Sequence, residues 1–211
     1  TLVTGSIGHL AAMTQLTNLD LHGNEDTPYG NITGHLADLS ALAGLTQLFI
    51  RATNITGTLA NIAALSNLYY LECSKGLLGP TITGALSDLA PIGNKLFYAY
   101  LHKQTAVTAG SIAAHTAIRI FHCWDMAWDQ AAVDAVLLAI YNARATFTYA
   151  GTIELSIGGN NAAPSGTYQD APSPSTAKEY IYKLCNDPDA EGFKKWRIIY
   201  NNDGAGNVTR P

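Results

Sequence analysis

Histidines, carboxylates and a glycine-rich run are the parts of this sequence with the chemistry for metal binding, acid–base work or phosphate binding. Three histidines and one glutamate are the candidates for a metal site, namely His22, His102, His122 and Glu72. Zinc sites are usually recognised by spacings such as HExxH or CxxC, and neither occurs here. The run at residues 158–161 is not followed by the Lys-Ser/Thr of a phosphate loop. We therefore expect solvated histidines, no metal site and no cofactor.

Asp20 and Glu72 are the acids considered for a catalytic pair. Both follow a leucine in short apolar segments that are predicted to be strands of one sheet. Alternation along these strands places the two acids on the same side of the sheet, two strands apart, with Phe49 between them. That arrangement separates them by about 10 Å, near the upper end for inverting glycosidases. A solvated face explains both acids more simply. We therefore predict no catalytic residue and no enzymatic activity, and keep a glycan-processing enzyme as the third alternative.

The composition indicates a folded protein with an unusually uncharged surface. The 211 residues are 47% hydrophobic but only 13% charged, about half the usual charged fraction. A surface rich in Thr, Ser, Asn, Gly and Tyr is typical of secreted, wall-associated and viral proteins. A net charge of −4 offers no basic face for nucleic acid, and no apolar run is long enough for a membrane span. Because the chain starts at Thr1, we expect a processed product or a fragment.

A repeat organises the first part of the chain. The string Val/Ile-Thr-Gly recurs, and its copies start at Val3, Ile32, Ile55 and Ile82, with a degenerate copy at Val107. Between copies the apolar residues follow the frame LxxLxLxxN, as in Leu45, Leu48 and Ile50. Asn24 and Thr53 occupy the final polar position in the first two repeats.

A solenoid fold accounts for this frame. Each repeat makes one turn of a coil, contributes one short strand to a parallel sheet, and stacks its aliphatic side chains on those of its neighbours. The final polar residue can bind backbone groups that would otherwise be buried unpaired. Residues 34–44 and 57–65 have the spacing of a short helix or 3₁₀ turn. Cys73 and Cys123 occupy apolar strand positions, and with Cys185 they are too few and scattered for a disulfide framework.

From these residues, the chain resembles the leucine-rich-repeat family, in the subtype with an L/I-T-G-x-L signature. The resemblance covers about residues 3–126, with insertions at residues 25–31 and 76–80. It implies an α/β leucine-rich-repeat solenoid with a parallel sheet on its concave face. It also implies a protein that binds through that face, by analogy with other curved solenoids.

Alternate residues of each frame strand should line the concave face. This face is predicted to be rich in aromatic side chains, which combine large contact area with polar tips and are enriched at binding hot spots. The alternative is that these residues only cover the sheet or meet a neighbouring subunit. The predicted ligand-binding residues are Phe49, Arg51, Tyr70, Glu72, Tyr98, Tyr100, His102, His122 and Trp124.

The pattern changes near residue 129, which divides the chain into repeats at 1–128 and capping units at 129–211. We predict helices at residues 130–145 and 175–186, and strands at residues 151–160 and 196–201. Asn160 is assigned to the final polar position of the frame that contains Leu155 and Ile157. These helix–strand units should continue the sheet and cap its open end. The run at 158–165, with the later Trp196-Arg-Ile-Ile, looks like a C-terminal unit of bacterial surface and phage tail-associated proteins.

Together these features predict a non-enzymatic binding or adhesion protein displayed on an exterior surface. Its partner would be a protein or a glycan on the concave face, with possible assembly subunits, and its location would be extracellular, at a cell surface or in a virion. The alternative is a structural component of a virion, such as a phage tail or capsid decoration protein.

Overall fold

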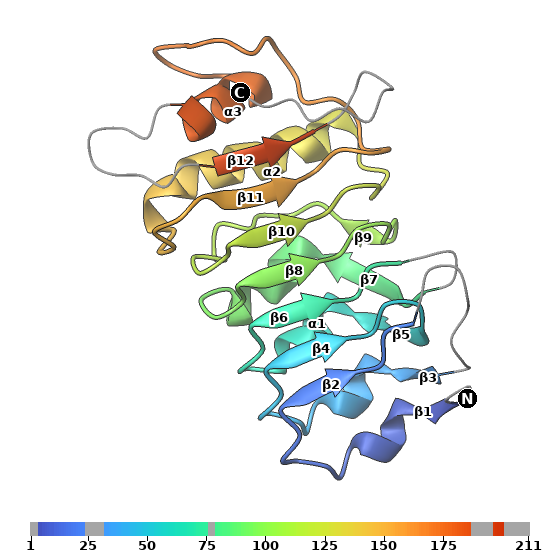
Figure 1. Ribbon diagram of the computed structural model, residues 1–211. Helices are drawn as coiled ribbons and strands as arrows, with labels where there is room; N and C mark the ends of the chain where they lie inside the picture. The colour runs from blue at the N-terminus through green and yellow to red at the C-terminus, as the bar shows by residue number, and fades with distance from the viewer. Residues whose placement is uncertain (1–3, 24–31, 76–78, 187–195, 201–211) are drawn as a thin grey trace.

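The computed structural model describes residues 4–23, 32–75, 79–186 and 196–200. The chain forms an elongated stack of coils that carries the N-terminal residues at one end and α3 at the other (Figure 1). The two predicted insertions, the polar position Asn24 and the tail after residue 201 lie wholly or largely outside the described residues. The described helices are too short or too polar to cross a lipid bilayer.

One side of the stack is a seven-stranded parallel sheet in the order β12-β11-β10-β8-β6-β4-β2. Its strands in chain order are β2 (Asn18–Asp20), β4 (Gln47–Phe49), β6 (Tyr70–Glu72), β8 (Tyr98–Tyr100), β10 (Ile120–His122), β11 (Ile153–Ser156) and β12 (Trp196–Ile199). The register pairs Leu48 with Leu71, and Ala99 with Phe121, so equivalent frame positions lie side by side. Each of these pairs joins two residues at the same position of the frame, so the repeat predicts the register of the sheet.

A second parallel sheet runs along the other side of the stack. Its strands are β1 (Gly5–Ser6), β3 (Ile32–His35), β5 (Asn54–Thr58), β7 (Thr81–Ala85) and β9 (Val107–Thr108). The expectation of a single strand in each coil was therefore wrong. The Ile-Thr-Gly strings pair with each other because their threonines are extended, and Thr56 Oγ1 donates to the carbonyl oxygen of Gly34 at 3.4 Å. The same bond joins Thr83 to Gly57 and Thr108 to Gly84.

The glycine of the repeated string allows successive coils to approach closely. Gly57 has a φ of +151°, and a Cβ atom there would lie 2.8 Å from the Cβ of Leu36 in the preceding coil. At Gly34 a Cβ would lie 2.6 Å from Cγ1 of Ile7. A side chain at either position would therefore push neighbouring coils apart.

Short helical turns follow the strands of the second sheet. They are η1 (Ile7–Leu10), η2 (Leu36–Leu39), α1 (Leu59–Ala63) and η3 (Leu86–Ile92), and η2 and α1 confirm the turns predicted at 34–44 and 57–65. Thr58 caps α1, since its Oγ1 accepts a hydrogen bond from the Asn61 amide at 3.2 Å. Leu59 and Ile62 then point into the core.

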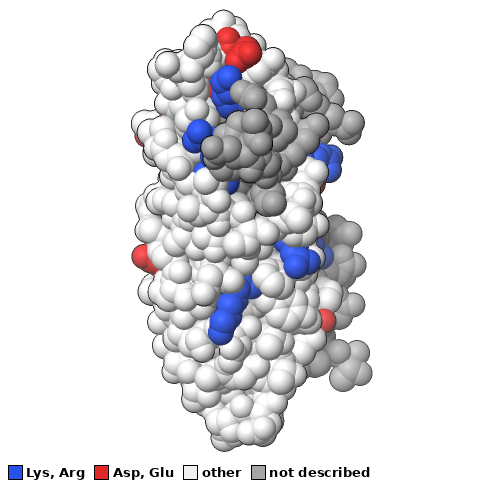
Figure 2. All heavy atoms as spheres, turned by 90° about the vertical axis from the view of Figure 1, so that its left-hand side faces the viewer, with Lys and Arg blue, Asp and Glu red and all other residues white. Residues whose placement is uncertain are grey.

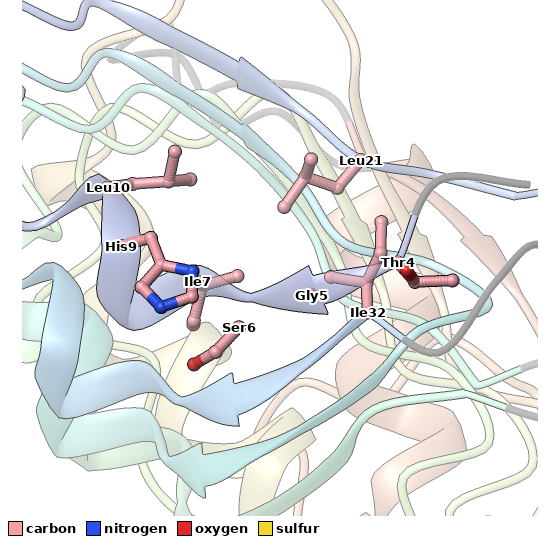
Figure 3. Close-up of a pocket in the computed structure, with 8 residues that line it drawn as sticks. All are labelled: Thr4, Gly5, Ser6, Ile7, His9, Leu10, Leu21 and Ile32. Carbon is pink, nitrogen blue, oxygen red and sulfur yellow. The ribbon is translucent and has the colours of Figure 1, made fainter.

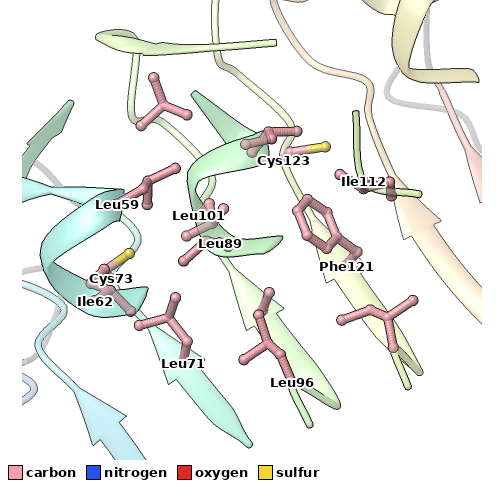
Figure 4. Close-up of a cluster of buried hydrophobic side chains, with 14 of the residues drawn as sticks. Leu59, Ile62, Leu71, Cys73, Leu89, Leu96, Leu101, Ile112, Phe121 and Cys123 are labelled. Carbon is pink, nitrogen blue, oxygen red and sulfur yellow. The ribbon is translucent and has the colours of Figure 1, made fainter. Parts of the chain in front are cut away.

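The core is a continuous hydrophobic spine between the two sheets (Figure 4). Leu71, Leu101 and Phe121 are fully buried, and the register places Leu71 and Phe121 on either side of the buried Ala99. Cys73 and Cys123 are free and buried, which confirms their role as small hydrophobic residues. In the first coil, however, Leu16 and Leu21 are only half-buried because one side of that coil has no described neighbour.

Polar residues after the frame strands satisfy buried backbone groups, as predicted. Gln104 Nε2 donates to the carbonyl oxygens of Cys73 and Pro80, and its Oε1 accepts from the Ile82 amide. In the coil of β11 the assignment to Asn160 was wrong, because Asn160 is exposed and the adjacent Asn161 is buried. The loop after β11 is one residue longer than the frame allows. Asn161, and not Asn160, therefore binds the buried backbone groups.

The C-terminal region adds two helix–strand units. The helices are α2 (Gln130–Ala143), followed by η4 (Arg144–Thr146), and α3 (Ala177–Asn186). They contact each other, with α2 behind the large sheet and α3 at the end of the stack (Figure 1). Asp129 caps α2 through a 2.8 Å bond from the Ala132 amide. Both helices lie within two residues of their predicted bounds, and β11 and β12 extend the large sheet in parallel. The division of the chain at residue 128 stays a prediction.

Candidate binding face

The side of the seven-stranded sheet opposite the spine is here called the outward face. Alternate strand residues point to it, and the parallel register arranges them in rows across the strands. The first row consists of Asn18, Gln47, Tyr70, Tyr98, Ile120, Glu154 and Arg197. The second row consists of Asp20, Phe49, Glu72, Tyr100, His122, Ser156 and Ile199.

A third row lies where the strands end. Backbone hydrogen bonds from Lys75 N to His102 O and from Lys103 N to Trp124 O, both 3.0 Å long, extend the same pairing beyond the strand bounds. The third row consists of His22, Arg51, Ser74, His102 and Trp124. All nine predicted ligand-binding residues therefore lie on the outward face.

The rings at the centre of this face form one contact network, here called the aromatic stripe and made up of Phe49, Tyr70, Tyr98, Tyr100 and His122. Ring centroids lie 4.6 Å apart for Phe49 and Tyr70, and 5.3 Å apart for Tyr70 and Tyr98. Tyr70 stacks on Tyr100 at 5.6 Å, and Tyr100 meets His122 edge-on at 4.9 Å. All five residues are half-buried, so their rings are held by each other while one side stays accessible.

Packing also fixes the protonation of the tyrosines. Burial raises the pKa of Tyr70, and Tyr100 and Glu72 raise it further. Burial likewise raises the pKa of Tyr100. Both phenols therefore keep their protons across the physiological range, and can donate hydrogen bonds as well as accept them.

The described carboxylates of the outward face each have a basic partner. Glu72 lies 3.5 Å from Arg51, and Asp20 is paired with His22. Glu154 has two partners, since Oε1 lies 2.9 Å from His122 Nε2 and Oε2 lies 2.8 Å from Arg197 Nη1.

Glu154 and Arg197 were missed by the sequence reasoning. The frame around Leu155 and Ile157 already implied that Glu154 points outward, because alternate residues of a strand face opposite sides. Arg197 could not be placed in the same way, since its strand carries no LxL frame. The pairing of β11 with β12 brings Arg197 beside Glu154. The face therefore continues into the C-terminal units.

His102 differs most from expectation. It was predicted to be a solvated histidine, but only 8% of it is exposed because its ring stacks on Trp124, with centroids 4.3 Å apart and planes 9° apart. Burial lowers the pKa of His102 to about 4, helped by His122 and Lys103. His102 is therefore neutral at physiological pH. Its buried ring supports Trp124 from below and contributes little to the solvent-exposed surface of the face.

The described residues hold no cluster of three metal-ligating side chains. His122 points to Glu154, and His102 lies under Trp124, so these two histidines do not converge with Glu72. The absence of a metal site in the whole chain stays a prediction.

A cleft of about 220 Å³ lies away from the outward face, at the N-terminal end of the stack (Figure 3). It opens between β1 and β2 and is lined mainly by aliphatic side chains, including Ile7, Leu10, Leu21 and Ile32. Met13, near this end, is 52% exposed. The cleft lies at the N-terminal end of the hydrophobic spine.

A third surface lies on the side where the strands of the large sheet begin. Figure 2 shows several Lys and Arg and a few Asp and Glu side chains on this side among mostly uncharged residues. One of its arginines, Arg119, is held between two aromatic rings, 4.3 Å from the Phe97 centroid and 4.8 Å from that of Tyr149. The Arg119 guanidinium group thus links the segments that precede β8 and β11.

Comparison with known proteins gives little further information. No protein-family model matches the chain, and no curated protein is similar to it. The LRR ectodomain of the receptor kinase SOBIR1 from Arabidopsis thaliana is similar at 19% identity and a TM-score of 0.39, over 58% of this chain and 63% of that one. The chain thus spans less than two thirds of that structure. The fold itself is mixed α/β with parallel strands in open sheets, and it fits a leucine-rich-repeat-like solenoid.

Proposed function

We propose that this protein is a non-enzymatic recognition protein that binds a protein or a glycan through the outward face, and that it is displayed on an exterior surface. The observation that carries the proposal is the aromatic stripe, which crosses four neighbouring strands without interruption. Tyrosine offers a large rigid contact area with a polar tip, and it is enriched at the centres of binding interfaces.

The polar groups around the stripe support binding over catalysis. Glu72 and Glu154 are held in ion pairs, and neither is placed beside a free acid or a nucleophile. Such groups can orient a ligand by hydrogen bonds. The low charge of the chain and its Thr-, Ser- and Asn-rich composition support display outside a cell.

Alanine variants of two stripe tyrosines and of Trp124, in the third row of the outward face, test this proposal. Tyr98→Ala, Tyr100→Ala and Trp124→Ala should each weaken partner binding by about 1 kcal/mol or more, as expected for hot-spot aromatics. Protein and glycan arrays would supply the partner, and surface plasmon resonance would measure the affinity. Tyr182→Ala on α3 is the matched control, because Tyr182 is half-buried and far from the stripe in the sheet order. Binding like that of the unmodified protein in all three variants refutes the proposal.

A structural role in a larger assembly, such as a virion, is the second candidate. The apolar cleft beside Met13 favours it, because aliphatic groups in an open cleft gain free energy when another subunit covers them. A virion component should copurify with particles and show one symmetric contact by electron microscopy. Met13→Glu should then reduce incorporation into particles, whereas Tyr98→Ala should not.

A further inference from the structure

Lysines and unpaired polar groups gather at one edge of the outward face, where β6, β8 and β10 end. This corner consists of the third-row residues Ser74, His102 and Trp124, and of Lys75 and Lys103, which directly follow Ser74 and His102 in the turns after the strands. The two 3.0 Å backbone bonds that join Lys75 to His102 and Lys103 to Trp124 place these residues on adjacent strands. Strand neighbours lie about 5 Å apart, so the corner is one compact site.

The corner has positive charge that the described residues do not neutralise. Neither Lys75 nor Lys103 forms an ion pair with a described residue. The acids nearby have other partners, since Glu72 pairs with Arg51 and Asp125 Oδ1 accepts the Asn160 amide at 2.7 Å. Two ammonium groups on adjacent strands repel each other, and a bound anion would remove that repulsion.

Buried polar atoms without partners lie beside the two lysines. Ser74 is fully buried and His102 is 8% exposed, yet Ser74 Oγ and His102 Nδ1 have no hydrogen-bond partner. Most buried polar groups in proteins are satisfied, and each exception costs free energy. A hydroxyl and a neutral imidazole can both donate and accept, so small rearrangements of the corner would let them bind a hydroxyl-rich ligand.

The corner also has an aromatic surface that leads into the stripe. The Trp124 indole is fixed by its stack on His102, and Lys103 Nζ lies 5.1 Å from the centroid of the indole. Tyr100 continues from the corner toward Tyr70 and Tyr98. Aromatic rings fixed in this way can stack on sugar rings.

We infer that the outward face binds an acidic carbohydrate, with a carboxylate of the glycan between Lys75 and Lys103 and sugar rings along Trp124 and the aromatic stripe. This inference rests on the proposed function and selects the glycan from the two partner classes left open there. The polarity of the face carries that choice. Phe49, Ile120 and Ile199 are the described members of the first two rows without a polar group, so the hydroxyl groups of a sugar would find hydrogen-bond partners at most positions of these rows.

Oligogalacturonate is a suitable probe, because its fully methyl-esterified form has the same sugar chain without the charge. Calorimetry on the full chain should show binding of the acid, at least about tenfold weaker binding of the ester, and loss of affinity as salt rises. The double variant Lys75→Gln/Lys103→Gln should bind the acid at least about fivefold more weakly, in the range of two exposed ion pairs. Lys178→Gln on α3 is the control and should leave the affinity unchanged.

Three results overturn the inference. Equal binding of the acid and the ester would show that the carboxylate charge does not contribute to recognition. Equal binding of polyglutamate would show that the sugar rings do not contribute. If the protein is folded by circular dichroism and does not bind oligogalacturonate, the inferred binding of acidic carbohydrate is wrong. The proposed function is tested separately, because Tyr98→Ala would still weaken binding to a protein or neutral glycan found on arrays.

Discussion

The two adjacent asparagines at the end of β11 allow a sharp test of how buried polar residues hold the coils together. Asn161 Oδ1 accepts from the amides of Met126 and Trp128 at 3.0 and 3.1 Å. Its Nδ2 donates to the carbonyl oxygens of Cys123 and Ile157, both at 2.9 Å. Asn160 is exposed, and its side chain accepts one bond, from the Ala127 amide at 2.9 Å.

Replacing each asparagine by leucine should therefore have very different effects. A hydrogen bond contributes about 1 kcal/mol net, so Asn161→Leu should lower the free energy of unfolding by about 4 kcal/mol. Asn160→Leu should lower it by about 1 kcal/mol on the same basis. Leucine has as many side-chain heavy atoms as asparagine and is larger, so neither substitution opens a cavity. The difference therefore reports the lost hydrogen bonds, to which overpacking at the buried site adds.

Urea denaturation followed by far-ultraviolet circular dichroism measures both values, with unchanged m-values as the sign that the unfolding reaction is the same. The reasoning is refuted if Asn160→Leu is as destabilising as Asn161→Leu. That result would mean that the four buried hydrogen bonds of Asn161 contribute no more to stability than the single bond of the exposed Asn160 side chain.

Three further predictions concern packing, pH and thiol chemistry. Gly57→Ala should destabilise the fold by about 1–3 kcal/mol in urea because a Cβ there meets Leu36, whereas Gly44→Ala, with no contact closer than 3.6 Å, should be nearly neutral. His102 takes up a proton near pH 4 in the fold and near pH 6.5 when unfolded, so stability should fall as pH drops from 6.5 to 4; His102→Gln should reduce that slope, and an unchanged slope contradicts the assignment. Cys73 and Cys123 should resist a thiol reagent in the native state and react in denaturant, since burial raises the pKa of both thiols; rapid native labelling would contradict their burial.

Much of the candidate face could be predicted because it depends on local periodicity. Once Leu48 and Leu71 are assigned to the core, alternation sends Phe49 and Tyr70 to the other side of the sheet. That reasoning placed all nine proposed residues on one face. It did not reveal the stack that buries His102, because ring geometry between neighbouring strands is not encoded in spacing.

The coil and the register of the large sheet could be predicted from the recurring apolar frame, and the bounds of the C-terminal helices from the helical spacing of their apolar residues. The second sheet of Ile-Thr-Gly strings, the burial of Asn161 in place of Asn160, and the link from His122 through Glu154 to Arg197 became visible in the folded chain. These features arise from contacts between coils that are 22 to 43 residues apart in the chain. Local patterns specify which way a side chain points, but the partner it meets depends on how the coils stack.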